Sequence, residues 1–181
     1  MNRIRTLLAT ATVLAFVPFA AFAETDTATS APTVTMTSVH TVTAGVFEAG
    51  ANVAAFTAAD IGTVLLTYST NSVADTQTST ITAIAAAWGP PAGATAAMPI
   101  LKATASAPAG GTAAGTAADQ VTLISGANVA AAAQTLVTGI TNGNGHTTTV
   151  TFAVDASDPT ITAGEYTTTV TFTLTASAGA V

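Results

Sequence analysis

The feature of this sequence that most restricts its fold is the alternation of threonine with apolar residues. The hexapeptide Thr-Thr-Thr-Val-Thr-Phe occurs at residues 147–152 and again at residues 167–172. A period of two places successive side chains on opposite faces of an extended strand. Threonine is β-branched and polar, so it suits the solvent face of such a strand. Residues 147–155 and 165–175 therefore predict two strands that each bury one face.

The same alternation predicts which side chains of these two strands face the core. Apolar residues at even positions point to one side of each strand, and the threonines between them point to the other. We expect the apolar side chains of both strands to form part of one core: Val150, Phe152, Val154, Val170, Phe172 and Leu174. The simplest arrangement of two such similar segments is as two strands of one sheet.

Further short apolar runs recur between these strands and the N-terminus. They predict additional strands at residues 33–43, 62–69, 78–86, 98–104, 121–125 and 134–140. Gly, Pro and Asn residues between the runs are typical of turns. The alanine run at residues 130–133 allows at most a short helical turn. A series of short strands without long helices predicts an all-β fold, an immunoglobulin-like β-sandwich.

The composition of the chain narrows the classes of function. Ala and Thr together make up 82 of the 181 residues, and charged residues make up 7%, against roughly 25% in an average soluble protein. Acid–base and nucleophilic catalysis depend on side chains that are scarce here, so we expect no enzymatic activity. The formal net charge of −6 argues against nucleic acid as a partner. Because the chain has no cysteine, its core must stabilise it without disulfides.

Residues 1–23 have the features of a secretory signal peptide. Arg3 and Arg5 precede an apolar stretch, which ends in the small-residue pattern Ala21-Phe22-Ala23 that precedes signal cleavage. The predicted mature chain begins at Glu24 and keeps one base, Lys102, against nine acids, a net charge of −8. It contains no further apolar stretch long enough to be a membrane span.

Polar side chains offer few candidates for a metal or cofactor site. His40 and His146 lack the spacing of metal ligands, so we predict two surface histidines, one on a strand and one in a turn. The oxygen-rich segments 142–145 and 155–158 would lie at one end of the sandwich if they bound calcium, but Asn and Asp in turns explain the same residues. We therefore expect neither a metal nor a cofactor.

Aromatic residues are few after residue 23, and the sequence predicts a place for some of them. Phe152 and Phe172 belong to the core by their parity. Tyr166, just after Gly164, is predicted to anchor a strand corner through its hydroxyl group. For Trp88, beside Gly89-Pro90-Pro91, core filling is favoured over an exposed binding platform.

Residues 163–175 contain Ala-Gly-x-Tyr followed by an alternating Val, Phe and Leu strand. This pattern resembles the last strand of chaperone–usher pilins, including alpha-type fimbriae and spore coat protein U-like subunits. Residues 34–39 resemble the alternating donor strand of such subunits. The resemblance covers the two ends of the chain and the succession of short strands between them. It implies an incomplete immunoglobulin-like sandwich that is completed by the N-terminal strand of a neighbouring subunit. Biofilm-fibre proteins of the camelysin type share several of these features.

The resemblance also implies which segment of the chain would be the donor and which would be the acceptor. Residues 24–43 would comprise a leader and the donor strand, and residues 44–181 the sandwich. The donor strand would insert alternating side chains into a groove on the next copy: Val34, Met36, Val39 and Val42. The six core residues named above would belong to the acceptor. We expect a secreted subunit that polymerises head-to-tail into a pilus or fibre at the cell surface.

The implied partners are other copies of the chain, a periplasmic chaperone and an outer-membrane usher. The alternative is a monomeric secreted adhesive or ligand-binding module. In that case residues 33–43 would pack into the sandwich of their own chain.

Overall fold

The computed structural model describes residues 39–49, 53–54, 56–71, 78–94, 97–110 and 115–176. They belong to one compact unit that spans residues 36–181. Within these ranges the chain contains only strands, turns and irregular segments, and nothing there forms a helix able to cross a membrane. The alanine run at residues 130–133, for which at most a short helical turn was expected, forms no helix, and Ala130 forms an isolated β-bridge with Ile124.

Ten strands lie in the described ranges, and every pairing between them is antiparallel. The first five are β1 (Val39–Ala44), β2 (Glu48–Ala49), β3 (Ala58–Asn71), β4 (Ser79–Ala85) and β5 (Ile100–Ala105). The others are β6 (Thr116–Ala117), β7 (Val121–Ile124), β8 (Gln134–Ile140), β9 (Gly143–Asp155) and β10 (Val170–Ala176). Each predicted strand corresponds to one of these.

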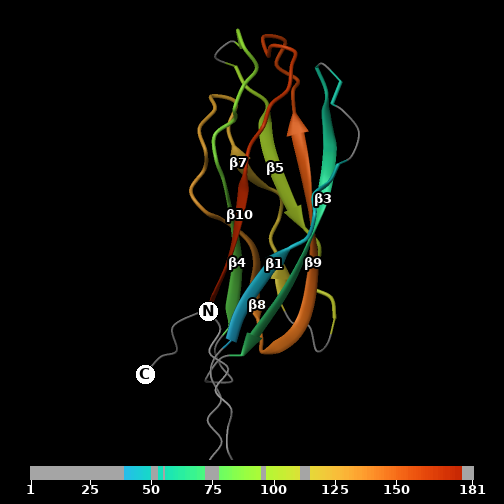
Figure 1. Ribbon diagram of the computed structural model, residues 1–181, viewed down its shortest axis with the longest axis vertical. Coiled ribbons are helices and arrows are strands. Elements are labelled where there is room, and N and C mark those ends of the chain that lie inside the picture. Colours follow the sequence, from blue (N-terminus) through green and yellow to red (C-terminus); the bar gives the residue numbers. More distant parts are fainter. Residues whose placement is uncertain are drawn as a thin grey trace, which may run out of the picture. The chain divides into compact units, whose positions relative to one another are not determined.

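The strands form two sheets (Figure 1). In the first sheet the order is β1-β3-β9-β5-β7, with β2 paired to β3 beyond the end of β1. In the second sheet the order is β10-β4-β8-β6. The prediction of an all-β fold is confirmed, and the two antiparallel sheets are consistent with a β-sandwich.

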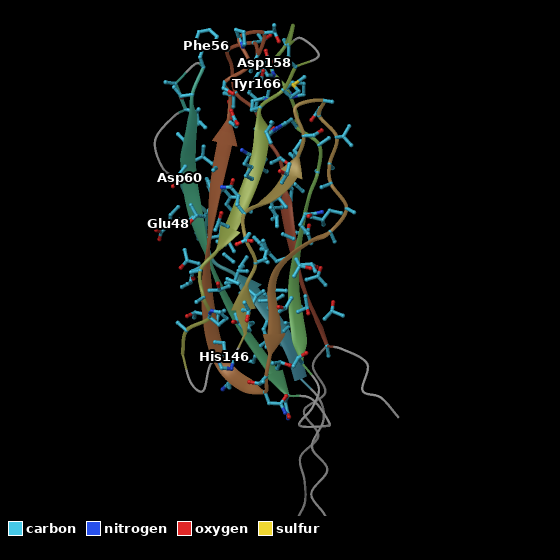
Figure 2. All side chains as sticks on the ribbon, turned by 180° about the vertical axis from the view of Figure 1, so that it is seen from behind. Glu48, Phe56, Asp60, His146, Asp158 and Tyr166 are labelled. Carbon is cyan, nitrogen blue, oxygen red and sulfur yellow. The ribbon has the colours of Figure 1, made fainter. Side chains whose placement is uncertain are left out.

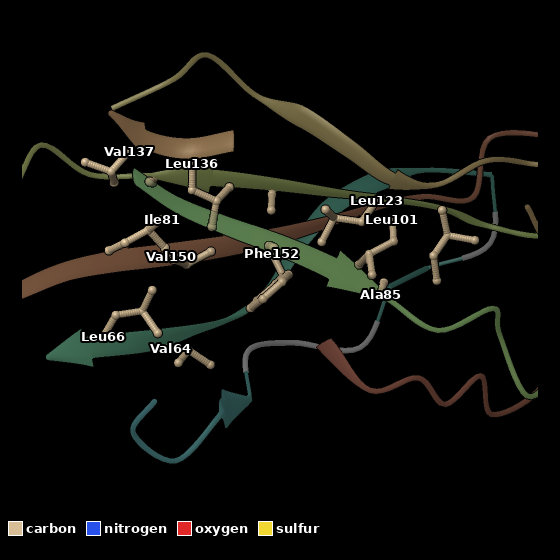
Figure 3. Close-up of a cluster of buried hydrophobic side chains, with 14 of the residues drawn as sticks. Val64, Leu66, Ile81, Ala85, Leu101, Leu123, Leu136, Val137, Val150 and Phe152 are labelled. Atoms are coloured by element: carbon tan, nitrogen blue, oxygen red, sulfur yellow. The ribbon is translucent and has the colours of Figure 1, made fainter. Parts of the chain in front are cut away.

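The core lies between the sheets and follows the alternation seen in the sequence (Figure 3). In β4 every odd position from Ser79 to Ala85 is buried, and in β9 every even position from His146 to Val154 is buried. The large buried side chains come from both sheets: Leu66, Ile81, Leu101, Leu123, Leu136, Val137 and Val150. Removal of this apolar surface from water stabilises the fold.

The two copies of the repeated hexapeptide lie in different sheets. The first copy is in β9, in the middle of the first sheet, and the second copy leads into β10, at the edge of the second. The prediction that both belong to one sheet is therefore wrong. Their phenylalanines instead meet across the core, where the ring centroids of Phe152 and Phe172 are 6.4 Å apart. Alternation determines which face of a strand is buried, but not which strand it pairs with.

Candidate functional site

One side of the sandwich, between strands β1 and β10, is open. These strands are the outermost strands of the two sheets, and they lie near each other (Figure 1). Within the described residues, β1 pairs only with β3, and β10 pairs only with β4. Each therefore has one long edge whose backbone N–H and C=O groups have no neighbouring strand, which is the usual place for an added strand to pair.

The inward side chains of β10 are incompletely covered. Val170, Phe172 and Leu174 pack against the core but are only half-buried. On β9, the predicted core residues Phe152 and Val154 are buried, as is Val150. All six predicted core residues thus face the interior, and the three on β10 keep part of their apolar surface exposed to solvent at the open side.

An open cavity of about 1190 Å³ occupies this side of the sandwich. Its walls come from β3 and β9 of the first sheet and from β10 with the segment that precedes it. Of the seven aromatic residues in the described ranges, only Tyr68 lies elsewhere. The other six line the cavity: Phe47, Phe56, Trp88, Phe152, Tyr166 and Phe172.

Trp88 forms a fixed part of the cavity wall. Its indole Nε1–H donates a hydrogen bond to the Pro99 carbonyl oxygen at 2.7 Å. The side chain of Asn128 holds its backbone, because Oδ1 accepts from the Trp88 N–H at 2.7 Å and Nδ2 donates to the Trp88 carbonyl at 3.3 Å. The indole is 7% exposed. Core filling is therefore confirmed for Trp88, although part of the ring also borders the cavity.

Tyr166 joins the cavity to the segment before β10. Its hydroxyl donates a hydrogen bond to the Thr162 carbonyl oxygen at 2.7 Å, as expected of a tyrosine that anchors a strand corner. This prediction is confirmed. Its ring meets that of Trp88 edge to face, with centroids 6.1 Å apart and planes at 75°, a favoured geometry for aromatic pairs.

Phe47 lies on the opposite wall, over a glycine of β3. It packs edge to face against Phe152 with ring centroids 6.0 Å apart, and it is 45% exposed. At Gly62 φ is +153°, and a Cβ atom there would collide with the carbonyl oxygen of Glu48 on β2 and lie 2.6 Å from Cζ of Phe47. Glycine is therefore needed at this position both for its backbone angle and for the close approach of the ring.

Phe56 lies at the rim of the cavity in an unusual backbone conformation. Its φ is +64° and its side chain is 62% exposed. Figure 2 shows it at the same end of the sandwich as Asp158 and Tyr166. A bulky residue with positive φ is rare and costs conformational energy, which is typical of segments that serve a function other than stability.

The charged groups that line the cavity are acidic. Asp158 and Glu165 belong to the lining, which includes no Lys, Arg or His among the described residues. Hydrogen bonds from the hydroxyl and the backbone N–H of Thr160 lower the pKa of Asp158. Lys102 lies outside the lining, on β5, with its Nζ 3.5 Å from Oδ2 of Asp155.

The predicted donor strand is described only in part. Val34 and Met36 lie outside the described residues. Val39 and Val42 belong to β1 and pair with Asn71 and Tyr68 of the same chain. In a single chain these two residues thus pair with their own sheet, and their insertion into a second copy stays a prediction.

The oxygen-rich segments considered for calcium do not meet. Residues 142–145 lie at the start of β9, and residues 155–158 lie at its other end. Thirteen residues separate the two ends of that strand, which is about 40 Å at the rise of an extended chain. The shared end of the sandwich that the calcium alternative required is therefore not formed by these two segments. The described ranges also bring no three His, Asp or Glu side chains together in a way that could hold a metal ion.

His146 is buried, so the prediction of a surface histidine in a turn is wrong. It is 1% exposed, and its Nδ1 lies 2.9 Å from the Gly110 carbonyl oxygen. Because a carbonyl only accepts, Nδ1 carries the proton of this hydrogen bond. His146 lies at the end of the sandwich away from Phe56 and Asp158 (Figure 2). For His40 only the backbone, within β1, is described.

Comparison with known proteins assigns no family. No family model matches the chain, and no curated protein or solved structure matches it significantly. The cavity must therefore be interpreted from its own residues. Its lining includes Phe47, Phe56 and Trp88, for which the alternation gave no place. The scarcity of aromatic residues in a chain rich in Ala and Thr was the signal that could have drawn attention to them.

Proposed function

We propose that this chain is a secreted structural subunit that polymerises head-to-tail, with the N-terminal segment of one copy filling the open side of the next. The observation that carries this proposal is the open side itself. There Ala44 at the end of edge strand β1 and Val170 and Phe172 of edge strand β10 line a cavity, and the inward side chains of β10 are only partly buried. In this proposal the sandwich is immunoglobulin-like and lacks the strand that would lie beside β10.

An extended segment with alternating apolar residues fits such a site physically. Its backbone would continue the hydrogen-bond ladder at a free edge, and every second side chain would enter the groove. Since Val39 and Val42 are already part of β1, the proposed donor is the segment before it, residues 24–38. Its inserting side chains would be Val34 and Met36, which share one parity.

The polarity of the sandwich favours a chain of subunits over a closed pair. β1 begins beside Asn71, at the end of the sandwich that contains His146, and runs toward the cavity, which Ala44 lines. The donor segment is thus covalently attached at the end away from the aromatic residues. Contacts between two different surfaces, repeated from copy to copy, produce open filaments. A periplasmic chaperone and an outer-membrane usher would be the assembly partners.

A monomeric ligand-binding or adhesive module is the second candidate. It is favoured by the pairing of β1 with β3 in the same chain, and by the concentration of aromatic side chains around one cavity. In this case the cavity would receive a ligand and not a strand.

Electron microscopy of four forms of the chain tests the proposal. The first is the mature chain, residues 24–181. The second begins at Val39, so that it keeps β1 and lacks only the donor segment. The third carries Val34→Asp and Met36→Asp, which place charges on the inserting face. The fourth carries Thr35→Asp and Thr37→Asp, which add the same charges on the opposite face.

The proposal expects filaments from the mature chain and from the Thr35/Thr37 variant only. If the Val34/Met36 variant loses filaments and the Thr35/Thr37 variant keeps them, the inserting face is identified, since both variants have the same net charge. Folded monomers in all four cases would contradict the proposal and leave the binding module. Circular dichroism establishes that each form is folded.

A further inference from the structure

The aromatic residues of this protein are concentrated to a degree that the fold does not require. Among the described residues, the core of the closed part of the sandwich is built mainly from Leu, Ile, Val and Ala, and Tyr68 is the only Phe, Tyr or Trp residue in it. Six other aromatic residues surround one open cavity. Aromatic walls with a few polar groups are typical of small-molecule binding sites, and cavities of roughly 300–1,000 Å³ hold drug-sized ligands. At about 1190 Å³, this one has room for a substantial apolar body.

The polar groups of the cavity define the charge of a suitable ligand. Asp158 and Glu165 both line the cavity, and Figure 2 shows Asp158 at the same end of the sandwich as Tyr166, which follows Glu165 in the chain. Within the described part of the chain, no basic side chain belongs to the lining, and Lys102 contacts Asp155 outside it. An anionic ligand would thus face negative charge without a partner, whereas a cation would be attracted.

The aromatic rings add a second attraction for the same charge. The faces of Trp, Tyr and Phe rings attract cations, Trp most strongly, and quaternary ammonium groups are recognised in this way. Trp88 and Tyr166 are held in place by hydrogen bonds to Pro99 and Thr162, so little ordering is needed when a ligand binds. Phe56, which also lines the cavity, is 62% exposed.

We propose that the cavity binds an organic cation with an apolar body. The body would lie among Phe47, Phe152 and Phe172, and the cationic group would lie at the rim near Asp158, Glu165 and Tyr166. The site is contained within one copy of the chain, so the inference goes beyond polymerisation and does not depend on it.

Trp88 provides the measurement, because it is the single tryptophan of the chain and lines the cavity. Its fluorescence is followed while the mature chain is titrated with decyltrimethylammonium or with decyl sulfate, both below their micelle concentrations. The Val34→Asp/Met36→Asp variant is titrated in parallel, since its N-terminal segment is not expected to fill the cavity of another copy. We expect the cation to bind at least about tenfold more tightly than the sulfate.

Two pairs of substitutions separate a local site from the general charge of the protein. Asp158→Asn with Glu165→Gln removes the acids of the lining and should reduce the preference for the cation to about twofold or less. Glu48→Gln with Asp60→Asn changes the net charge equally but lies outside the lining, and should keep the preference. A rise in the melting temperature on adding the cation checks that it binds the folded state.

The proposal is overturned if neither the mature chain nor the Val34/Met36 variant binds the cation, if the sulfate binds equally well, or if both charge variants lose the preference equally. Binding by the variant but not by filaments of the mature chain supports the proposal, and indicates that a strand and the cation use the same space. A synthetic peptide of residues 24–38 that displaces the cation would lead to the same conclusion.

Discussion

The two ends of the sandwich differ in how completely the sheets enclose their core. Around Leu66, Ile81, Leu136 and Val150, both sheets contribute side chains that are almost entirely excluded from solvent. Around the cavity, large aromatic rings replace these aliphatic side chains, and Phe47 and Phe172 keep part of their surface exposed. Both ends follow the same alternation along their strands. At the cavity one wall is formed by Val170 and Phe172 of β10, an edge strand with one neighbour, and by the irregular segment before it, while β8 and β9 each lie between two strands.

The comparison indicates that the open side results from the arrangement of the sheets. It does not result from a weak alternation of apolar residues. The segment 170–176 alternates as regularly as β9 does, yet its inward residues are half-buried. Exposed apolar surface in a folded protein usually marks a binding or assembly site. The substitutions below compare enclosed positions of the sandwich with positions at its open side or its cavity, beginning with the largest expected effect.

The largest contrast is expected for two leucines of identical chemistry. Leu136 on β8 is 1% exposed, and Leu174 on β10 is half-buried. Leu136→Ala should lower the free energy of unfolding by about 3 kcal/mol, because it removes buried surface and leaves a cavity. Leu174→Ala should lower it by about 1 kcal/mol, because much less surface is removed from water there. Urea denaturation of the monomeric chain measures both.

The same pair tests whether the open side is filled in an assembly. If a strand of a second copy covers β10, the cost of Leu174→Ala should rise in filaments toward that of Leu136→Ala. Equal costs in the monomer would contradict the comparison, since they would mean that both side chains are already enclosed.

Gly62 offers a second and smaller test, at the wall of the cavity. Gly62→Ala should cost about 2 kcal/mol, because the new Cβ would collide with the Glu48 carbonyl oxygen and with Phe47, and because the backbone angle disfavours L-residues. Gly139 is a matched control. Its φ is +67°, and a Cβ there would meet nothing within 4 Å, so Gly139→Ala should cost about 1 kcal/mol from backbone strain alone. Thermal or urea unfolding measures the difference, and equal costs would mean that both Phe47 and the backbone of Glu48 move aside freely.

The sequence was sufficient to predict the strands and the buried face of most of them. Residues 134–140 coincide with β8, and Val150, Phe152 and Val154 are buried as their parity requires. These features depend on local periodicity. Sheet membership depends on pairing between distant segments, so the repeated hexapeptide did not reveal that β9 and β10 lie in different sheets.

Local sequence patterns could not predict the cavity or the burial of His146, because both depend on contacts between distant segments. Phe47, Trp88 and Tyr166 come from three distant segments, and only the folded chain brings them to one surface. His146 follows Asn-Gly-Asn-Gly, which is typical of a turn. It is buried because β9 extends back to Gly143 and pairs with β3 as far as Thr70.

The smallest contrast is expected for the two tyrosines. The Tyr166 hydroxyl, near the cavity, donates to the Thr162 carbonyl, so Tyr166→Phe should lower the free energy of unfolding by about 1 kcal/mol. The Tyr68 hydroxyl, at the closed end, is buried without a hydrogen-bond partner among the described residues. Tyr68→Phe should therefore leave stability unchanged or raise it slightly at neutral pH, because an unsatisfied polar group is removed. Urea denaturation at pH 7 measures both.

Stability at alkaline pH tests whether the Tyr68 hydroxyl is buried without a partner or is hydrogen-bonded in solution. Burial raises the pKa of Tyr68, so the folded state favours the neutral phenol, while the unfolded chain ionises near pH 10. The contribution of Tyr68 to stability is thus complete below about pH 10 and is lost as the pH rises toward the higher pKa of the folded state. Stability of the wild-type chain should fall more steeply above pH 10 than that of Tyr68→Phe. Parallel curves, or a clear loss of stability in Tyr68→Phe at pH 7, would mean that the closed end admits water or a partner to this hydroxyl.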